Sequence, residues 1–384
     1  MSSERNPVEP ARQPTAEPGT SFDVTPTDEQ KMLVEAVRDF ALRACRPAAL
    51  GADDACCTPA ELLATATELG LAALGVPEAH GGVLECRSTV TAALIAEALA
   101  EGDMGIALAC LAPAGVATAL GLWGDAEQQA EYLPAFAGES PPAAAIALSE
   151  PRVLFDPFAL ETRATRSASG DFVLAGVKAL VPRAAEAELL LVAAALDGAP
   201  SLFIVETGST GVSATADPGM GLRAAATARV SFEDVRLPAS ALVGEADPQA
   251  YRELIALCRL GWSALAVGTG QAVLDYVSGY VNQRMAFGEP ISNRQSVAFM
   301  VANIAIELES LRLATYRAAG LAETGHDFIR AAALSRALAA QHAMRIGSDG
   351  VQLLGGHGYT KEHPVERWYR DLRAAGMLEG ALLL

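Results

Sequence analysis

The stretch from Gln352 to Gly380 reads QLLGGHGYTKEHPVERWYRDLRAAGMLEG and combines a glycine turn, a charged helix and a single late acid. Gly355 and Gly356 follow an apolar helical pattern, so they predict a helix end where the backbone approaches another group closely. Pro364 suits the first turn of the next helix, in which acids alternate with arginines. Glu379 follows among apolar neighbours, so we expect an apolar setting for its carboxylate, which suits a general base. Taken alone, the stretch also fits a plain helix end with an exposed acid beyond it.

Length and charge restrict the possible functions. The chain has 384 residues, which is more than one ordinary core needs, so two or three domains are expected. Hydrophobic residues make up 51% and the mean hydropathy is +0.25, but charges interrupt the apolar runs, so we expect a soluble protein without a transmembrane helix. With 46 acids against 28 Lys plus Arg the net charge is −18, which argues against nucleic acid or an anionic membrane as a partner. A few local arginines must hold any anionic ligand.

The six cysteines show neither metal-ligand spacing nor the framework of a small disulfide-rich scaffold. We therefore expect reduced thiols and a cytoplasmic protein. His357 and His363 lack the i, i+4 spacing of a helical metal pair, so no metal site is predicted.

The chain divides into four parts by composition. Residues 1–24 are polar and proline-rich and predict a disordered tail, without the apolar core of a signal peptide. Residues 25–140 are alanine-rich and predict a helical domain, whose first helix begins with a capping box from Thr27 to Gln30.

The second half of the chain changes pattern twice. Residues 141–245 contain short apolar or alternating runs separated by Gly, Asp and Pro, which is typical of strands. The runs are AAAIALS (143–149), DFVLAGVKALV (171–181), LLLVAAAL (189–196), SLFIVE (201–206) and ARVSFEDVRLP (228–238). Residues 246–384 return to long helical periodicity. The predicted fold class is α+β multidomain, with an N-terminal α-helical domain, a small middle β-barrel or sandwich domain and a C-terminal bundle of the four-helix type.

This domain order and a series of motifs resemble the acyl-CoA dehydrogenase family from about residue 25 to residue 380. The motifs that carry the resemblance are IALSEP (146–151), GDFVLAGVKALV (170–181), VSFEDVRLP (230–238), YVNQRMAFGEPI (280–291), QLLGGHGY (352–359) and PVERWYRD (364–371). Each motif alone is weak, but their shared order makes chance an unlikely explanation.

The resemblance implies α,β-dehydrogenation of an acyl-CoA thioester with FAD as cofactor. In that chemistry a base removes the α-proton and the β-hydrogen leaves as hydride to the flavin. Glu379 matches the family's base, although Leu378 replaces the usual tyrosine before it, and Arg259 matches a substrate-binding arginine near the acyl-CoA entrance. The resemblance also implies an electron-transfer acceptor protein and a homo- or hetero-oligomer, either a dimer or a tetramer.

The cofactor contacts are implied in the same way. Arg284 and Phe287 match residues that hold the pyrophosphate and adenosine side of FAD, and a guanidinium suits phosphate. Further contacts are implied for Leu148, Ser149, Gln295, Gln352, Gly355 and Gly356. In this family, the residues that match Gln295, Gln352, Gly355 and Gly356 contact the FAD of a neighbouring subunit. The simpler alternatives are surface ion pairs for the arginines and a packing turn for the glycines.

Some positions depart from the family pattern around the flavin ring. Leu154 and Phe155 stand where the family has Gly and Ser, so a loop expected to approach the flavin is bulky. Leu180 and Pro182 replace an aromatic residue and a threonine, and proline offers neither hydroxyl nor N–H. The residues after Gly380 also lack the family's usual tail. Two functional classes therefore remain open: an active dehydrogenase for an unusual or bulky acyl-CoA, or a non-catalytic or half-catalytic subunit that donates contacts to a partner's FAD. A relative specialised for carrier-protein thioesters is a further alternative.

Overall fold

A computed structural model describes residues 26–82 and 87–384 of the chain. The predicted disordered tail and Cys86 lie outside these residues. The N-terminal part is helical, and the capping box is confirmed, since the Thr27 hydroxyl accepts from the Gln30 N–H and the Gln30 side chain accepts from the Thr27 N–H. Its helices are α1 (Asp28–Phe40), the π-turn η1 (Ala41–Cys45), α2 (Arg46–Ala55), α3 (Ala60–Glu68), α4 (Thr89–Ala100), α5 (Met104–Trp123) and α6 (Ala126–Phe136).

Helix α5 corrects one expectation from the sequence. It is 20 residues long with a mean hydropathy of 1.9, so it is long and apolar enough to cross a membrane, contrary to our prediction. Of its most apolar window, 89% is buried inside the protein. A helix that is apolar on every side is also what a core position requires, and α5 is packed among the other helices as a central core element.

The middle part is one eight-stranded sheet. Its strands are β1 (Ala144–Ala147), β2 (Arg163–Arg166), β3 (Phe172–Val181), β4 (Leu189–Leu196), β5 (Ala199–Glu206), β6 (Val212–Ala216), β7 (Ala228–Leu237) and β8 (Leu242–Val243). The order is β6-β7-β3-β2-β4-β5-β8, and β1 pairs parallel to β4. The sheet has its own apolar core, in which Phe172 and Phe203 meet edge to face with ring centroids 5.1 Å apart.

The C-terminal part is a bundle of long helices. It consists of α7 (Pro248–Gln283), the hairpin of β9 (Met285–Ala286) and β10 (Glu289–Pro290), α8 (Gln295–Glu323), α9 (Ile329–Leu354), the turn η8 (Gly355–Tyr359), α10 (Val365–Leu372) and α11 (Ala374–Met377). The predicted helix end is confirmed, because α9 stops at Leu354 and Gly355 has a φ of +56°.

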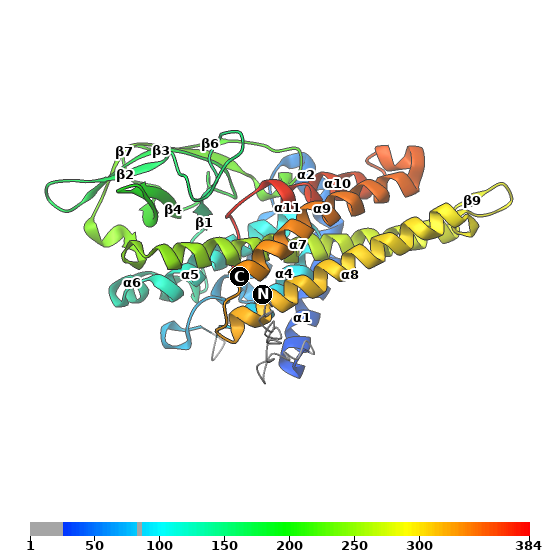
Figure 1. The fold of residues 1–384 in the computed structure, drawn as a ribbon, viewed down its shortest axis with the longest axis horizontal. Coiled ribbons are helices and arrows are strands. Elements are labelled where there is room, and N and C mark those ends of the chain that lie inside the picture. Colours follow the sequence, from blue (N-terminus) through cyan, green and yellow to red (C-terminus); the bar gives the residue numbers. More distant parts are fainter. Residues whose placement is uncertain (1–25, 83–86) are drawn as a thin grey trace, which may run out of the picture.

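The three parts meet along α7. Figure 1 shows that α7 begins below the sheet and runs the length of the molecule toward the β9–β10 hairpin at the opposite end. Short 3-10 turns join the elements: η2 (Leu71–Ala73), η3 (Glu78–His80), η4 (Arg223–Ala225), η5 (Ala239–Ala241), η6 (Gly244–Ala246) and η7 (Ile291–Asn293). The predicted fold class, with a helical domain, a β domain and a helical bundle in this order, is confirmed.

Candidate active site

Glu379 and Arg259 meet at the junction of the sheet and the bundle. Arg259, in the first half of α7, donates from Nε to both carboxylate oxygens of Glu379 at 3.2 Å and from Nη2 to Oε1 at 3.0 Å. The side chains are 24% and 15% exposed. The sequence neighbours of Glu379 suggested an apolar setting for its carboxylate, and that expectation is wrong, because the fold brings an arginine from 120 residues away onto both oxygens.

The backbone around Glu379 is held from three different elements. Arg336 of α9 donates from Nη2 to the carbonyl oxygen of Leu378 at 2.6 Å. The Ser149 hydroxyl donates to the carbonyl of Glu379 at 2.8 Å, and the Trp262 indole N–H donates to the carbonyl of Gly380 at 2.9 Å. Three consecutive carbonyls are thus fixed by side chains from α9, from the segment after β1 and from α7.

Gly380 is required by this arrangement. Its φ is +73°, and a Cβ at this position would lie 2.6 Å from the Cβ of Leu148. A larger residue would therefore push the segment that carries Glu379 away from the sheet.

The segment after β1 is anchored by a buried ion pair. Lys178 of β3 donates to the Leu148 carbonyl at 3.0 Å and to Glu150 at 2.8 Å, and it is fully buried. Burial lowers the pKa of Lys178 to about 8, against the opposing effect of Glu150. This pair holds Leu148 and Ser149 in place, and Ser149 in turn contacts the backbone of Glu379.

An apolar cavity of about 150 Å³ lies beside Leu378, the residue before the candidate base. Its walls come from the β domain and from the segment before Glu379, and they include Leu180, Gly219, Met220, Gly221, Leu222, Thr227, Arg370, Arg373, Ala374, Met377 and Leu378. The side chain of Leu180, which replaces the family's aromatic residue, thus faces this cavity.

Residues 219–222, which form one wall of that cavity, are fixed to α10. Asp371 accepts from the N–H of Leu222 at 2.6 Å. A Cβ on Gly221 would lie 2.4 Å from the Arg370 carbonyl oxygen, so this glycine lets the two backbones pack closely. Asp371 lies near the Asp103–Arg367 ion pair, and burial together with the charge of Asp103 raises the pKa of Asp371 to about 8.

The loop that replaces the family's glycine-containing segment turns outward. Leu154 has a φ of +54° and is 92% exposed, and Val153 beside it is also exposed. Phe155 lies under the guanidinium of Arg152, whose centre is 5.6 Å from the ring centroid. The bulk of Leu154 therefore projects into solvent instead of into the protein.

The remaining predicted cofactor residues lie at the opposite end of α7. Arg284, the C-cap of α7, and Phe287 in the β9–β10 hairpin are both exposed. Within residues 26–82 and 87–384, the Arg284 guanidinium forms no ion pair. Arg284 is 25 residues beyond Arg259, so at the helical rise it lies about 37 Å away.

The glycines of η8 lie at the same end of the bundle. His363, just after η8, packs against Tyr276 and Tyr280 of the last turns of α7, and Tyr276 is hydrogen bonded to its Nδ1 at 2.6 Å. Gln295, Gln352, Gly355 and Gly356 are all exposed. The structure thus separates the candidate residues into two groups: Glu379, Arg259, Leu148 and Ser149 at one place, and the residues predicted to contact the nucleotide at the far end.

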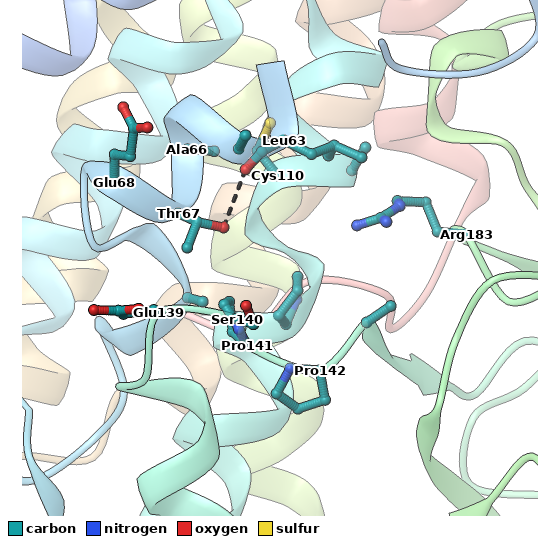
Figure 2. A pocket seen from close by; sticks show the side chains of 15 residues that line it. Leu63, Ala66, Thr67, Glu68, Cys110, Glu139, Ser140, Pro141, Pro142 and Arg183 are labelled. Carbon is teal, nitrogen blue, oxygen red and sulfur yellow. Dashed lines mark hydrogen bonds between the residues drawn. The ribbon is translucent and has the colours of Figure 1, made fainter. Parts of the chain in front are cut away.

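A second, larger cavity contains none of the predicted residues. It has a volume of about 350 Å³ and lies between α3, α5 and the entrance to the sheet. Figure 2 shows Arg183 reaching toward it from the β domain, opposite Thr67 and Cys110. Burial raises the pKa of the Cys110 thiol to about 12, so this cysteine is not a reactive group.

Comparison with known proteins gives the family. Models of the N-terminal, middle and C-terminal domains of acyl-CoA dehydrogenases match residues 27–140, 145–235 and 249–382. This chain belongs to the acyl-CoA dehydrogenase family. It is 33% identical over 365 residues to cyclohex-1-ene-1-carbonyl-CoA dehydrogenase of Geobacter metallireducens, with 92% of this chain and 95% of the relative covered. Human mitochondrial short-chain specific acyl-CoA dehydrogenase is also 33% identical, with 92% and 87% covered.

Solved structures of acyl-CoA dehydrogenases also match this chain. Butyryl-CoA dehydrogenase from Megasphaera elsdenii superimposes with a TM-score of 0.86 at 28% identity, with 94% of this chain and 96% of that chain covered. A family member from Bacillus anthracis was solved in complex with FAD, and it matches with a TM-score of 0.81 at 29% identity, covering 92% of this chain and 64% of that chain. Acyl-CoA dehydrogenases are FAD-dependent oxidoreductases that act on CH–CH bonds.

Three residues of the site were missed by sequence reasoning: Arg336, Trp262 and Asp371. For Arg336 a signal existed, because it stands at helical spacing within the alanine stripe of α9, near Ala332 and Ala339, which are both buried. A charge on an apolar helix face needs a partner, and that requirement was readable from the sequence. The contacts of Trp262 and Asp371 depend on residues more than 100 positions away and carried no such local signal.

Proposed function

We propose that this chain catalyses the α,β-dehydrogenation of an acyl-CoA thioester, with Glu379 as the base and FAD as the oxidant. The observation that carries the proposal is the Glu379 carboxylate, which Arg259 fixes directly after Leu378, a residue that lines an apolar cavity between the β domain and the bundle. A base that acts on a carbon acid needs a defined position, because proton transfer requires close approach.

The reaction divides into two transfers. Glu379 takes the α-proton, which the thioester carbonyl makes acidic, and the electrons of that C–H bond form the new double bond. The β-hydrogen leaves with its electron pair as hydride, for which FAD would supply the acceptor. The products are the enoyl-CoA, a protonated Glu379 and a reduced cofactor, so protons and electrons balance.

The contacts of Arg259 select the oxygen that receives the proton. Oε1 of Glu379 accepts two bonds from Arg259, whereas Oε2 accepts only one, from an Nε that it shares with Oε1. We assign Oε2 as the proton acceptor, because it is the less engaged atom. Arg259 then keeps the carboxylate oriented through Oε1 while Oε2 changes its protonation state.

The residues present fit FAD as parts of a shared site. Arg284 offers an exposed guanidinium for phosphate, and η8 offers glycine backbone that a nucleotide approaches closely. The cavity of about 150 Å³ beside Leu378 offers apolar surface to part of the flat ring system. Since Arg284 and Arg259 are about 37 Å apart along α7, we assign the nucleotide contacts to the FAD that serves Glu379 of a second copy. An oligomer is therefore part of the active form.

The substrate class and electron acceptor follow from the relatives. The similar enzymes act on short, branched or cyclic acyl-CoA esters by their names, and one structural neighbour, with a TM-score of 0.86, is titled for an electron-transferring flavoprotein. We propose a compact acyl-CoA as substrate and an electron-transfer protein as acceptor.

The test is anaerobic mixing of the FAD-loaded oligomer with saturated short, branched and cyclic acyl-CoA esters. We expect the absorbance of oxidised flavin to decrease with at least one ester. The product should be the enoyl-CoA, which has two hydrogens fewer than the substrate. An FAD-saturated protein that is reduced by none of the three classes would overturn the proposal.

A further inference from the structure

Arg336 is a buried charge that the dehydrogenation chemistry described above does not use. Its exposed fraction is 8%, and it lies in the first half of α9 among alanines. Transfer of a guanidinium out of water is costly unless its charge and its N–H groups are compensated. The contacts of Arg336 should therefore explain why a charged side chain is buried here.

The contacts of Arg336 point to the segment that carries Glu379. Its Nη2 donates to the carbonyl of Leu378 at 2.6 Å, the residue directly before Glu379. Within the described residues, its Nε and Nη1 have no hydrogen-bond partner, and it forms no ion pair. Burial lowers the pKa of Arg336, and the acid that opposes this effect is Glu379.

Two arginines therefore face one carboxylate from different helices. Arg259 of α7 binds the side chain of Glu379, and Arg336 of α9 binds the backbone one residue earlier. Other groups near this carboxylate are Tyr251 and Cys258 of α7, both buried and both held in the neutral form, since burial raises their pKa values. The charge of Glu379 is thus paired directly with Arg259, and Arg336 adds a second positive charge at the backbone of the same segment.

We infer that Arg336 is a positioning residue for Glu379: it fixes the Leu378 carbonyl and, through its charge, holds the carboxylate in the place where it receives the α-proton. This inference rests on the proposed function, in which Glu379 is the base. A neutral donor would satisfy one carbonyl at a lower desolvation cost, so the retained charge indicates a second, electrostatic task.

Three variants at this position separate the two tasks. Arg336→Lys keeps the charge and a donor, Arg336→Gln keeps only a donor, and Arg336→Met keeps neither. In the FAD-loaded oligomer we expect kcat to fall roughly 10- to 100-fold in Arg336→Met, within the range typical of a lost charged hydrogen bond. We expect an intermediate loss in Arg336→Gln and recovery of most of kcat in Arg336→Lys, with KM and FAD content little changed in all three.

Two readouts go beyond turnover. With an acyl-CoA deuterated at the α-carbon, the isotope effect on flavin reduction should increase in Arg336→Met, because proton removal becomes slower. Amide hydrogen exchange in residues 374–384 should become faster in the same variant even without substrate. Arg345→Met is the matched control, since Arg345 lies on the same helix with its side chain exposed and paired with Glu307.

The turnover of the Arg336 variants can contradict the inference. Unchanged kcat in Arg336→Met, or equal losses in the Lys and Met variants, would overturn the inference. If Arg336→Met does not fold, the comparison of Arg336→Lys with Arg336→Gln decides, because equal kcat in these two removes the electrostatic role. In a Glu379→Gln background, Arg336→Met should cause no further loss, and an additive loss would mean that Arg336 acts independently of Glu379.

The two single variants, Glu379→Gln and Arg336→Met, also separate the two claims. Normal turnover in Glu379→Gln alone would mean that the proposed function assigns the wrong base. An inactive Glu379→Gln together with a fully active Arg336→Met would remove only the role of Arg336.

Discussion

Arg259 and Glu379 are 120 residues apart in the sequence and form an ion pair with a shortest distance of 3.0 Å. The pair joins α7 to the segment after α11, so it links the position of the candidate base to the longest helix of the protein. Since the side chains are only partly buried, the ion pair contributes little to folding stability, and its main effect is to orient the Glu379 carboxylate.

Replacement of Arg259 should therefore affect turnover more than folding. We expect Arg259→Gln to lower kcat/KM about 10- to 100-fold, because a charged hydrogen bond contributes about 1.5–3 kcal/mol. FAD content should remain near that of the wild type. Arg252→Gln, an exposed arginine two turns earlier on α7, is the control for nonspecific loss of charge. Equal kcat/KM in the Arg259 and Arg252 variants would show that the ion pair has no role in turnover.

The distance of about 37 Å between Arg259 and Arg284 along α7 predicts complementation between chains. Arg284→Ala should release FAD, and Glu379→Gln should be inactive. When both variants are co-expressed with different tags and mixed oligomers are isolated, one site per pair contains an intact Arg284 and an intact Glu379. We expect activity in the mixed oligomer to exceed that of either parent. Mixed oligomers with no more activity than their parents would place both residues in the same site.

The flavin-ring walls predict weak binding of FAD by the chain expressed alone. Leu180 faces the cavity and Pro182 is buried nearby, and neither offers a side-chain donor or acceptor. We expect less than one FAD per chain after purification and saturation when FAD is added. Pro182→Thr, which restores a hydroxyl and an N–H, should increase the flavin content. Stoichiometric FAD in the unsupplemented wild-type protein would contradict this expectation, and failure to load even with added FAD would favour the role of a supporting subunit.

Asp371 predicts how stability depends on pH. Burial and the nearby charge of Asp103 raise its pKa from the ordinary 3.8 to about 8, so between about pH 4 and pH 8 the native state holds a proton that the unfolded chain has lost. In this pH window the native state binds more protons than the unfolded state. The contribution of Asp371 to the free energy of unfolding therefore falls as pH rises, by up to about 1.4 kcal/mol per pH unit.

Asp371→Asn removes this dependence and keeps an oxygen that accepts from Leu222. In urea unfolding at pH 5 to 8, we expect the stability of the variant relative to the wild type to increase steadily with pH. The exposed Asp28→Asn is the control. Parallel stability curves for the wild type and Asp371→Asn would mean that Asp371 is already ionised at pH 5.

Much of the fold was predictable because its signals are local. The Thr27 capping box, the helix end at Gly355 and the apolar runs that become β1, β3, β4, β5 and β7 each depend on neighbouring residues, and the structure has them where they were expected. The strands β2 (RATR) and β6 (VSATA) were missed because their side chains are mostly exposed and polar or small. Their pairing depends on neighbouring strands, which no local pattern encodes.

The sequence offered candidate residues for the site but not their contacts. Motif resemblance pointed to Glu379, Arg259 and Arg284, but the apolar neighbours of Glu379 gave a wrong expectation of its setting. The ion pair depends on how α7 passes the end of the chain, and this is decided by packing of the whole bundle. For Arg336 the sequence indicates a buried charge that needs a partner, because it stands in the alanine stripe of α9, but the identity of that partner, the Leu378 carbonyl, depends on the folded structure.

The most direct test of the central claim is single-turnover flavin reduction in Glu379→Gln. The variant keeps the shape of the side chain and removes the proton acceptor, so we expect the rate of flavin reduction by a substrate acyl-CoA to fall at least about 100-fold. FAD content should be unchanged, and Glu309→Gln, an exposed acid on α8, should reduce its flavin at the wild-type rate. A wild-type rate of flavin reduction in FAD-loaded Glu379→Gln would contradict the account and remove Glu379 as the base.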